Sequence, residues 1–304
     1  MNEIYDAIII GAGPAGLSCG LYLARSNLNV LLLEAEVPGG LAGTAPIVEN
    51  YPGFPDGITG AELTKKMFDQ ARKNGAKIKF KESVIDLEVE GEIKKVITEK
   101  KEYETKCVVI ATGARPIKLP EKLGIKKEDK LVGKGVHYCA TCDGQMYAGK
   151  DVAVVGKDEY AVKEALFLND ICRSVTLIAD GEISAEDKIL EKLNSSQISV
   201  VHGTITDLLG EDKLEGVVIN GRERLNVEAL FVALGTVPNT ELFARKGIEI
   251  GKKRYIKVDN EMRTNIEGVF ACGDVTGGVR QIAVAVGEGV IAAYSVRDYL
   301  KVRK

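Results

Sequence analysis

The feature that most constrains the fold of this chain is a glycine-rich turn near its N-terminus, which joins a strand-like segment to a helix-like segment. A short apolar run over 4–10 precedes the turn at 11–16, and an apolar-periodic run follows it up to residue 25. A second apolar run over 30–33 then ends at Glu34. Strand, glycine turn, helix, strand and acid in this order are typical of a dinucleotide-binding unit.

The residues of the turn have the types that such a unit needs. We expect Gly11 to allow the tight turn, Gly13 to let a pyrophosphate approach the backbone, and Gly16 to let the helix pack closely on the strand. The helix N-terminus then faces the phosphates. Glu34 stands where it can accept a hydrogen bond from a ribose hydroxyl.

The same order of elements recurs later in the chain. An apolar strand over 151–155, a turn at Gly156, a helical segment over 159–169 and a strand over 175–178 repeat it. Each copy runs into a β-rich stretch and then a buried strand with a glycine–proline exit, which we interpret as a hinge. The sequence therefore predicts an α/β protein with two Rossmann-like three-layer (ββα) dinucleotide-binding domains, the second inserted in the first.

The last part of the chain sets the expected domain boundaries. A strand that ends at 273–274 and a long small-residue helix over about 280–299 complete the first unit. We therefore expect one domain over 1–115 and 241–304, and an inserted domain over 116–240.

Two cysteines separated by two residues lie in the inserted part, and an acid follows the second. Cys139 and Cys142 can close and reopen a small strained ring, which indicates redox chemistry. A structural zinc site would need two more ligands, and only His137 and His202 are present without a second close cysteine pair, so we expect no metal. Asp143 follows the second cysteine and precedes a glycine, as a turn residue can.

Composition excludes several classes of function. The chain carries 41 Lys and Arg against 44 Asp and Glu, so it lacks the basic excess of a nucleic-acid-binding protein. Its most apolar stretch, over 7–24, is interrupted by glycines and has no basic start, which disfavours a membrane span or a signal peptide. Six cysteines spread over 304 residues are not a secreted disulfide framework, so we expect a cytoplasmic location.

The other cysteines and the first histidine have simpler interpretations. Cys19, Cys107, Cys172 and Cys272 are expected to be small residues of the core. His137, two residues before the cysteine pair, is expected to make a packing or polar contact, or else to tune a thiol pKa.

Together these residues resemble the low-molecular-weight thioredoxin reductases, and the match covers nearly the whole chain. It rests on an ordered set of motifs at 11–16, 39–40, 48–53, 111–113, 139–144, 273–274 and 280–281. The resemblance implies a homodimeric FAD enzyme that reduces the disulfide of thioredoxin or a thioredoxin-like protein. It implies neither a nucleic-acid partner nor a membrane partner.

The resemblance also implies which residues hold FAD. The ADP half would be bound by residues of the first turn and strand: Gly11, Gly13, Pro14, Ala15, Gly16 and Glu34. The rest of the cofactor would be bound by later residues of the first domain: Gly40, Asn50, Ala111, Thr112, Gly113, Gly273, Asp274, Arg280, Gln281 and Ile282. The last three would open a helix whose positive dipole end stabilises the reduced flavin.

For the cysteine pair, the resemblance implies two different roles. Cys142 would lie against the flavin, and Cys139 would attack the disulfide of the partner protein to give a mixed disulfide. Asp143 would serve as general acid for the outgoing thiolate.

The second dinucleotide unit departs from the family pattern where NADPH should bind. The second glycine of its turn is replaced by Asp158, with Lys157 before it, and Asp180 rather than an arginine follows the next strand. Carboxylates at these places repel phosphates. The changes resemble those in atypical members that take electrons from a reduced deazaflavin coenzyme or from ferredoxin. NAD(P)H bound in a shifted pose stays an alternative.

Three functions on this scaffold stay open. The leading hypothesis is an FAD-dependent thioredoxin-disulfide reductase that passes electrons through Cys139 and Cys142. The second is a flavin-dependent dithiol oxidase that passes electrons to oxygen. The third is a non-enzymatic flavin redox sensor.

Overall fold

The computed structural model describes residues 3–120 and 127–302. The chain divides into two compact units: Met1–Arg115 with Val237–Lys304, and Pro116–Thr236. We call them the first unit and the second unit. The second unit is thus inserted into the first.

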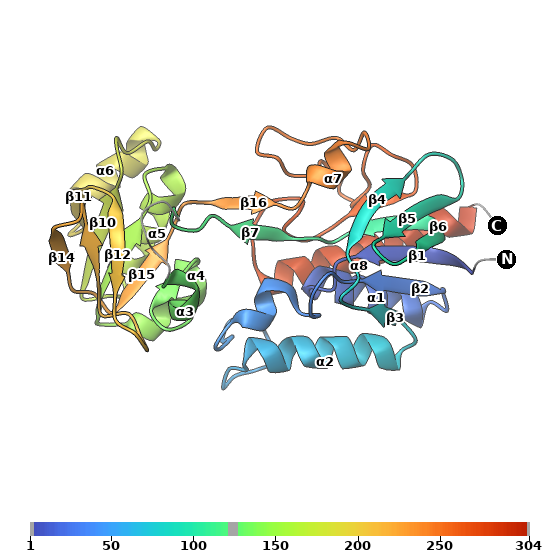
Figure 1. The fold of residues 1–304 in the computed structure, drawn as a ribbon, viewed down its shortest axis with the longest axis horizontal. Helices are drawn as coiled ribbons and strands as arrows, with labels where there is room; N and C mark the ends of the chain where they lie inside the picture. The colour runs from blue at the N-terminus through green and yellow to red at the C-terminus, as the bar shows by residue number, and fades with distance from the viewer. Residues whose placement is uncertain (1–2, 121–126, 303–304) are drawn as a thin grey trace. The chain divides into compact units, whose positions relative to one another are not determined.

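The chain returns to the first unit before the boundary that the sequence suggested at 240/241. Asn239 is already held there, because its side-chain amide donates to the carbonyl of Thr112 at 2.8 Å. The hydroxyl of Thr112 donates in turn to the Asn239 carbonyl at 3.0 Å. The connecting segments, β7 (Ala114–Pro116) and β16 (Thr236–Pro238), pair with each other as a two-stranded sheet (Figure 1).

The first unit is built on one large sheet with helices packed on it (Figure 1). Its strands are β1 (Ile4–Ile10), β2 (Val30–Leu33), β3 (Lys77–Lys79), β4 (Val84–Glu88), β5 (Lys94–Thr98), β6 (Glu102–Ile110) and β17 (Val269–Ala271). Its helical elements are α1 (Pro14–Arg25), η1 (Gly40–Thr44), α2 (Gly60–Lys73), α7 (Glu241–Ala244) and α8 (Ile282–Val302). Helices α1, α2 and α8 pack on one face of the sheet and the short α7 on the other (Figure 1). The parallel strands run in the order β3-β2-β1-β6, with β17 beside β6, and β5 and β4 extend the sheet in antiparallel fashion.

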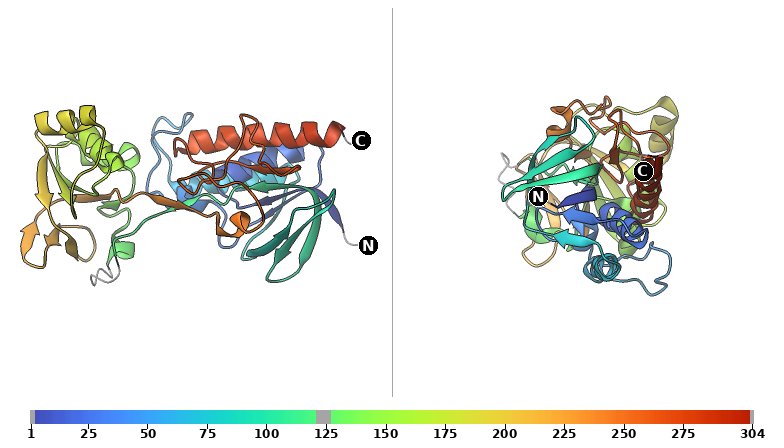
Figure 2. Two further views of the ribbon diagram at one scale, coloured as in Figure 1. Left: turned by 90° about the horizontal axis from the view of Figure 1, so that it is seen from above. Right: turned by 90° about the vertical axis from the view of Figure 1, so that its right-hand side faces the viewer.

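Two glycines let β1 turn directly into α1. Gly11 has φ +105°, and a Cβ there would lie 2.3 Å from the carbonyl oxygen of Ala111. A Cβ on Gly16 would lie 2.0 Å from the carbonyl oxygen of Gly11. Neither position accepts a side chain, so the glycine spacing allows α1 to pack closely on the sheet. α1 also packs against α8, which lies beside it in Figure 2.

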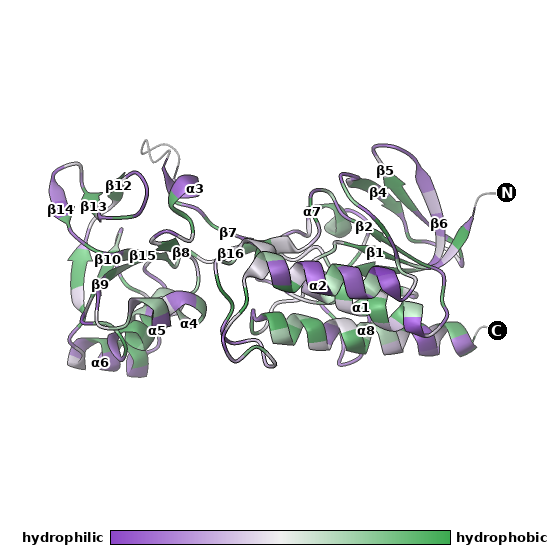
Figure 3. Cartoon of the chain, turned by 90° about the horizontal axis from the view of Figure 1, so that it is seen from below, coloured by the Kyte–Doolittle hydropathy of each residue, from purple (hydrophilic) through white to green (hydrophobic). Residues whose placement is uncertain are grey.

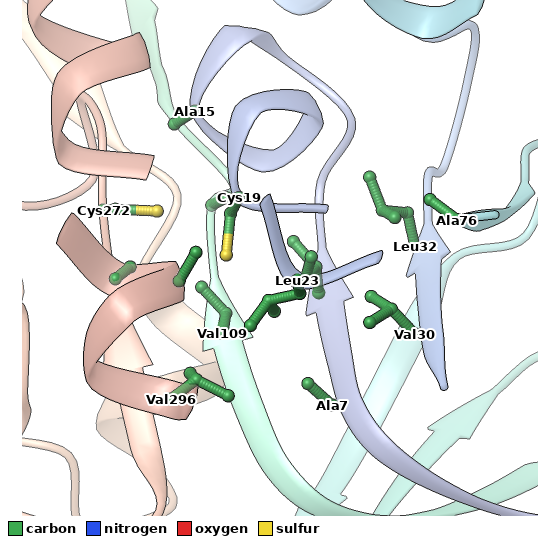
Figure 4. Packing of buried hydrophobic residues seen from close by; sticks show 14 of the residues in the cluster. Ala7, Ala15, Cys19, Leu23, Val30, Leu32, Ala76, Val109, Cys272 and Val296 are labelled. Carbon is green, nitrogen blue, oxygen red and sulfur yellow. The ribbon is translucent and has the colours of Figure 1, made fainter. Parts of the chain in front are cut away.

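Apolar side chains cover both faces of this sheet. The cluster under α1 and α8 includes Cys19, Leu23, Val109 and Val296, which Figure 4 shows together. A second cluster on the opposite face includes Ile8 and residues of β4 to β6. Burial on both faces explains why the central strands are almost continuously apolar. In Figure 3 helix α8 is coloured mostly as hydrophobic, whereas α2 carries many hydrophilic residues.

The second unit has a central parallel sheet between a helical layer and a small antiparallel sheet. The parallel strands, in the order β11-β10-β9-β15-β8, are β8 (Val136–His137), β9 (Asp151–Val155), β10 (Ser174–Ala179), β11 (Ser199–His202) and β15 (Ala229–Val232). The antiparallel strands are β12 (Ile205–Leu209), β13 (Gly216–Ile219) and β14 (Glu223–Leu225). The helical elements are α3 (Glu128–Leu131), α4 (Ala140–Asp143), η3 (Gly144–Tyr147), α5 (Glu159–Asn169) and α6 (Asp187–Ser195).

These layers confirm the predicted α/β fold class with two Rossmann-like units, one inserted in the other. The expected C-terminal helix needs a correction at both ends, because it begins at Ile282 rather than Arg280 and continues past 299 to Val302. Within the described part of the chain, no helix combines the length and apolarity that a membrane span requires.

Candidate active site

The registers of the first sheet bring several predicted site residues to one edge. Ile10 pairs with Leu33 of β2 and with Ile110 of β6, and Ala271 of β17 also pairs with Ile110. The residues that follow these parallel strands therefore share the carboxyl edge of the sheet, which is where ligands bind in folds of this type. These residues are Gly11, Glu34, Ala111 and Cys272, with Gly273 next in the chain.

The glycine turn of the first unit leaves the start of α1 open. Gly13 is the N-cap of α1 and provides no side-chain hydrogen bond to the first turn of the helix. A Cβ on Gly13 would meet only the Cα of Gly40, at 4.0 Å. Backbone N–H groups of the first helical turn have no partner within the helix, so this N-terminus can accept a phosphate.

Glu34 closes the other side of this turn. Its Oε2 accepts from the backbone N–H of Ala12 at 2.7 Å, and its Oε1 accepts from the N–H of Glu36 at 3.0 Å. The carboxylate is therefore fixed beside the glycine turn, where the sequence analysis expected it to accept from a ribose.

Other residues of the first unit that were predicted to bind the cofactor also lie close to one another. The amide of Asn50 donates to Oε1 of Gln281 at 3.2 Å, although 231 positions separate them in sequence. Gly273 lies so close to Ala15 that a Cβ on the glycine would be 2.8 Å from the alanine Cβ. Gly113 accepts from the N–H of Asn239 at 3.1 Å, and Thr112 bonds the same residue, so these two also fix the exit from the unit.

Two acids beyond β17 are partly buried. Burial raises the pKa of Asp274, and the Arg280 guanidinium opposes that shift. Burial also raises the pKa of Glu288, whose Oε2 accepts from the backbone N–H of Gly273 at 2.7 Å. Sequence reasoning did not find Glu288, which lies within the apolar helix α8. An acid in such a helix was the available signal.

The second unit carries the cysteine pair just beyond the end of β8. Cys139 and Cys142 form a disulfide, with their Sγ atoms 2.10 Å apart. Cys142 is exposed, whereas Cys139 is half-buried and caps the short helix α4. The backbone N–H of Cys142 donates to Sγ of Cys139 at 3.2 Å. A donor at this sulfur favours the thiolate of Cys139 once the disulfide opens.

Asp143 is linked by hydrogen bonds to the buried His137 and, through it, to Tyr147. Its Oδ2 lies 2.9 Å from Nδ1 of His137, and Nε2 of the same ring lies 2.9 Å from the hydroxyl of Tyr147. His137 is 2% exposed and stacks on Phe231, its partner across β8 and β15, at 5.5 Å between ring centres. Burial raises the pKa of Tyr147, and the nearby Asp143 adds to the shift. His137 therefore makes both the packing and the polar contact that the sequence suggested.

A second buried acid holds the backbone of the cysteine pair. Glu164 of α5 is 8% exposed, and its Oε2 accepts from the N–H of Ala140 at 2.5 Å. This bond fixes the start of α4 between the two cysteines. Sequence reasoning missed Glu164, although it lies among Ala161, Ala165 and Leu168 on the buried face of α5.

The helix of the second dinucleotide unit is closed by its own side chain. Asp158 is the N-cap of α5, and its Oδ1 accepts from the N–H of Ala161 at 3.0 Å. Lys157 pairs with Asp180 at 3.2 Å, and its carbonyl accepts from the N–H of Ser184 at 2.8 Å. The segment after β10 therefore folds back onto the turn before α5. The corresponding turn before α1 of the first unit stays open.

The remaining cysteines divide into two groups. Cys19, Cys107 and Cys272 are fully buried, and burial raises the thiol pKa of Cys19 and of Cys272, whose sulfur atoms Figure 4 shows among apolar side chains. The expectation for Cys172 needs a correction, because this residue is half-exposed at the end of α5 and only packs against the core cluster. Burial raises the pKa of Cys172 as well.

Comparisons with known proteins agree with this arrangement. The family described as pyridine nucleotide-disulphide oxidoreductase matches residues 5–289. The chain is 38% identical to a 34.2 kDa protein in the rubredoxin operon of Clostridium pasteurianum, over 97% of both chains. It is 36% identical to thioredoxin reductase of Bacillus subtilis, over 99% of this chain and 96% of that one. The crystal structure of thioredoxin reductase from Streptococcus pyogenes is similar with a TM-score of 0.93 at 35% identity, over 99% of this chain and 100% of that chain.

Proposed function

The chain belongs to the pyridine nucleotide-disulphide oxidoreductase family as an oxidoreductase that acts on a disulfide, and from this premise we propose that it reduces thioredoxin with electrons from a donor other than NADPH. The observation that carries the disulfide chemistry is the Cys139–Cys142 pair, with Asp143 held next to it. The observation that carries the donor proposal is the self-capped helix α5.

The first unit fits FAD, the cofactor of this family. The open N-terminus of α1 suits its pyrophosphate, and Glu34 beside it suits a ribose hydroxyl. Asn50, Gln281 and Asp274 provide polar groups for the rest of the molecule. When bound, FAD supplies the two-electron chemistry that reduces the Cys139–Cys142 disulfide.

The cysteine pair then carries the exchange with thioredoxin. The thiolate of Cys139 attacks one sulfur of the partner disulfide, so a bond forms to Sγ of Cys139 and the partner S–S bond breaks. The leaving sulfur takes the electron pair and receives a proton from Asp143. Cys142 then attacks Sγ of Cys139, which restores the intramolecular disulfide and releases the second partner thiol.

The second unit offers a dinucleotide little room at its helix start. Asp158 fills the position of the second glycine and takes the N–H of Ala161 for itself. The pair of Lys157 with Asp180 covers the same turn, with an acid where a 2′-phosphate would need a base. These contacts disfavour NADPH in its usual pose. The resemblance to atypical members then favours a reduced deazaflavin coenzyme or reduced ferredoxin as donor. NAD(P)H in a shifted pose is the alternative.

The thiol chemistry can be tested without knowing the donor. The FAD-loaded protein is reduced with dithionite under anaerobic conditions, freed of excess reductant and mixed with thioredoxin disulfide. We expect two partner thiols per flavin, and background release from a Cys139→Ser variant. Release no greater than that of the variant would contradict the proposal. Rapid oxygen consumption with a small dithiol would instead favour the oxidase, and a slow response to either substrate would favour the sensor.

Two further expectations remain predictions. The resemblance implies a homodimer, and the cysteine usage indicates a cytoplasmic location. Sedimentation of the FAD-loaded protein tests the dimer, and fractionation of cells that produce the chain tests the location.

A further inference from the structure

Asp143 is hydrogen-bonded to two further residues, the buried His137 and, through it, Tyr147, and we call these three residues the polar triad. Both ring nitrogens of His137 are occupied, one by Oδ2 of Asp143 and one by the hydroxyl of Tyr147, each at 2.9 Å. The His137 side chain is 1% exposed and that of Asp143 is 17% exposed. A ring in this position cannot exchange either contact for water, so the direction of its two hydrogen bonds decides what Asp143 can do.

The surroundings favour one direction. The hydroxyl of Tyr147 can donate to Nε2 of His137, whereas the ionised carboxylate of Asp143 can only accept from Nδ1. A neutral ring that accepts at Nε2 carries its own proton at Nδ1. That N–H donates to Oδ2 of Asp143. Within the described chain, the other carboxylate oxygen of Asp143, Oδ1, has no hydrogen bond.

Other groups pack against the polar triad from three sides. Phe231 of β15 stacks on the ring of His137 and touches Tyr147 edge-on, with 6.0 Å between those two ring centres. Lys150 lies 5.2 Å from the centre of the Tyr147 ring. Glu164 of α5 points at the N–H of Ala140 instead. The Tyr147 hydroxyl is therefore the group that faces Nε2.

We propose that the hydroxyl of Tyr147 holds His137 in the tautomer that carries its proton on Nδ1. His137 is then a positioning residue, because its Nδ1–H keeps Oδ2 of Asp143 as a hydrogen-bond acceptor. The proton that Asp143 transfers therefore sits on Oδ1. This inference rests on the proposed function, in which Asp143 is the general acid. When the thiolate of Cys139 opens the partner disulfide, the Oδ1 proton passes to the leaving sulfur, which already holds the electron pair of the broken S–S bond. Oδ2 keeps its hydrogen bond to His137 before and after the transfer.

The tautomer can be measured without turnover. The chain has two histidines, so a His202→Gln variant leaves the imidazole signals of His137 alone in a long-range ¹H–¹⁵N spectrum. His202 is exposed and contacts only the carbonyl of Gly181 among the described residues, which makes it a suitable position to change. We expect Nδ1 of His137 to carry the ring proton, and a further Tyr147→Phe change to mix the tautomers. The Nε2–H tautomer, or a spectrum that Tyr147→Phe leaves unchanged, would overturn the proposal.

Kinetics then test the consequence for Asp143. His137→Phe keeps a ring that can stack on Phe231 but removes both nitrogens, whereas His137→Asn keeps a donor near the position of Nδ1. In thiol release from the dithionite-reduced protein, we expect the Phe variant to lose about tenfold in rate, with its pH profile displaced and KM for thioredoxin unchanged. The Asn variant should recover part of the rate. Equal rates for the Phe variant and the unchanged protein would contradict the positioning role.

A matched tyrosine guards against a general loss of structure. Tyr160 donates to the carbonyl of Tyr138 at 3.3 Å in the same unit. Tyr160→Phe therefore removes a hydroxyl and leaves the hydrogen bonds among Asp143, His137 and Tyr147 in place. We expect its pH profile to match that of the unchanged protein, whereas that of Tyr147→Phe is displaced. If the unchanged protein releases no thioredoxin thiols, the proposed function fails, and the tautomer spectrum still decides the hydrogen-bond assignment.

Discussion

Oδ1 of Asp158 accepts a hydrogen bond from the backbone N–H of Ala161 at 3.0 Å, so the second unit caps its own helix where the first unit leaves Gly13 bare. The two units have the same order of elements, and this cap is one of the contacts by which their helix starts differ. An open helix start attracts a phosphate, and a start filled by a carboxylate repels one. The residue that replaces the second glycine of this turn, Asp158, therefore serves as the N-cap of α5.

Replacing Asp158 should reopen the second helix start. A like charge at about 4 Å costs roughly 1 to 4 kcal/mol, depending on the local dielectric constant. We therefore expect Asp158→Gly to strengthen NADH binding by about tenfold or more, while the lost cap lowers the free energy of unfolding by only a few tenths of a kcal/mol. Titration of NADH against the flavin-loaded variant measures this.

The matched variant is Asp158→Asn, which keeps a cap of similar strength and a similar volume but removes the charge. It should gain less NADH affinity than the glycine variant. Equal, unchanged affinity in both variants would mean that something other than Asp158 excludes the dinucleotide.

Two glycines of the first turn should respond differently to alanine. Gly11→Ala places a Cβ 2.3 Å from the Ala111 carbonyl at a φ of +105°, so we expect the free energy of unfolding to fall by about 3 kcal/mol or more. Gly13→Ala meets only the Cα of Gly40 at 4.0 Å, so the flavin-free protein should keep its stability and lose affinity for FAD. Thermal melts without FAD and fluorescence titration with FAD separate the two effects. A normal FAD affinity in Gly13→Ala would argue against a phosphate at this helix start.

Much of the fold could be predicted because local signals and tertiary packing agree. Clear periodicity marks the strand at 4–10, the helix that ends at Arg25 and the repeat at 151–169. The turns between these elements need glycines, because a side chain there would clash with neighbouring backbone. The start of α8 was placed two residues early, because Arg280 and Gln281 continue the sequence pattern without being helical. The return to the first unit was placed late, because the bonds of Asn239 to Thr112 join segments far apart in sequence.

The sequence indicated the reactive residues of the candidate site, but not the residues that hold them in place by hydrogen bonds. Cys139, Cys142 and Asp143 follow from a short motif. Tyr147 and Glu164 did not, because their contacts arise only when η3 and α5 pack beside α4. Glu164 left one usable signal, an acid on an apolar helix face. The cap formed by Asp158 could also have been predicted from the sequence, because an acid just before a helix is a common N-cap.

Asp274 should act on stability and FAD affinity with opposite signs. Burial raises its folded pKa, so its contribution to stability is fully present below the unfolded pKa and is lost as the pH rises through the folded pKa. At neutral pH the ionised group therefore costs stability in the flavin-free protein. We expect Asp274→Asn to raise the melting temperature without FAD, to flatten the acid-side pH dependence and to weaken FAD binding. A lower melting temperature at neutral pH without FAD would contradict this account.

The two cysteines should separate in a trapping experiment. Cys142→Ser keeps the attacking thiol of Cys139 and removes the thiol that resolves the mixed disulfide, so we expect a stable covalent complex with thioredoxin on a non-reducing gel. Cys139→Ser should form no such complex under the same conditions. A complex that forms with Cys139→Ser and not with Cys142→Ser would reverse the assigned roles.

We propose that this protein reduces thioredoxin with electrons from a donor other than NADPH. The most direct test is anaerobic bleaching of the flavin by four donors in parallel: NADPH, NADH, a reduced deazaflavin coenzyme and reduced ferredoxin. The thioredoxin thiols released are counted in each reaction. We predict that the deazaflavin or ferredoxin bleaches the flavin and releases thiols, while NADPH does neither at a comparable rate. Bleaching by NADPH as fast as by the best of the others, with thiol release, would contradict the claim.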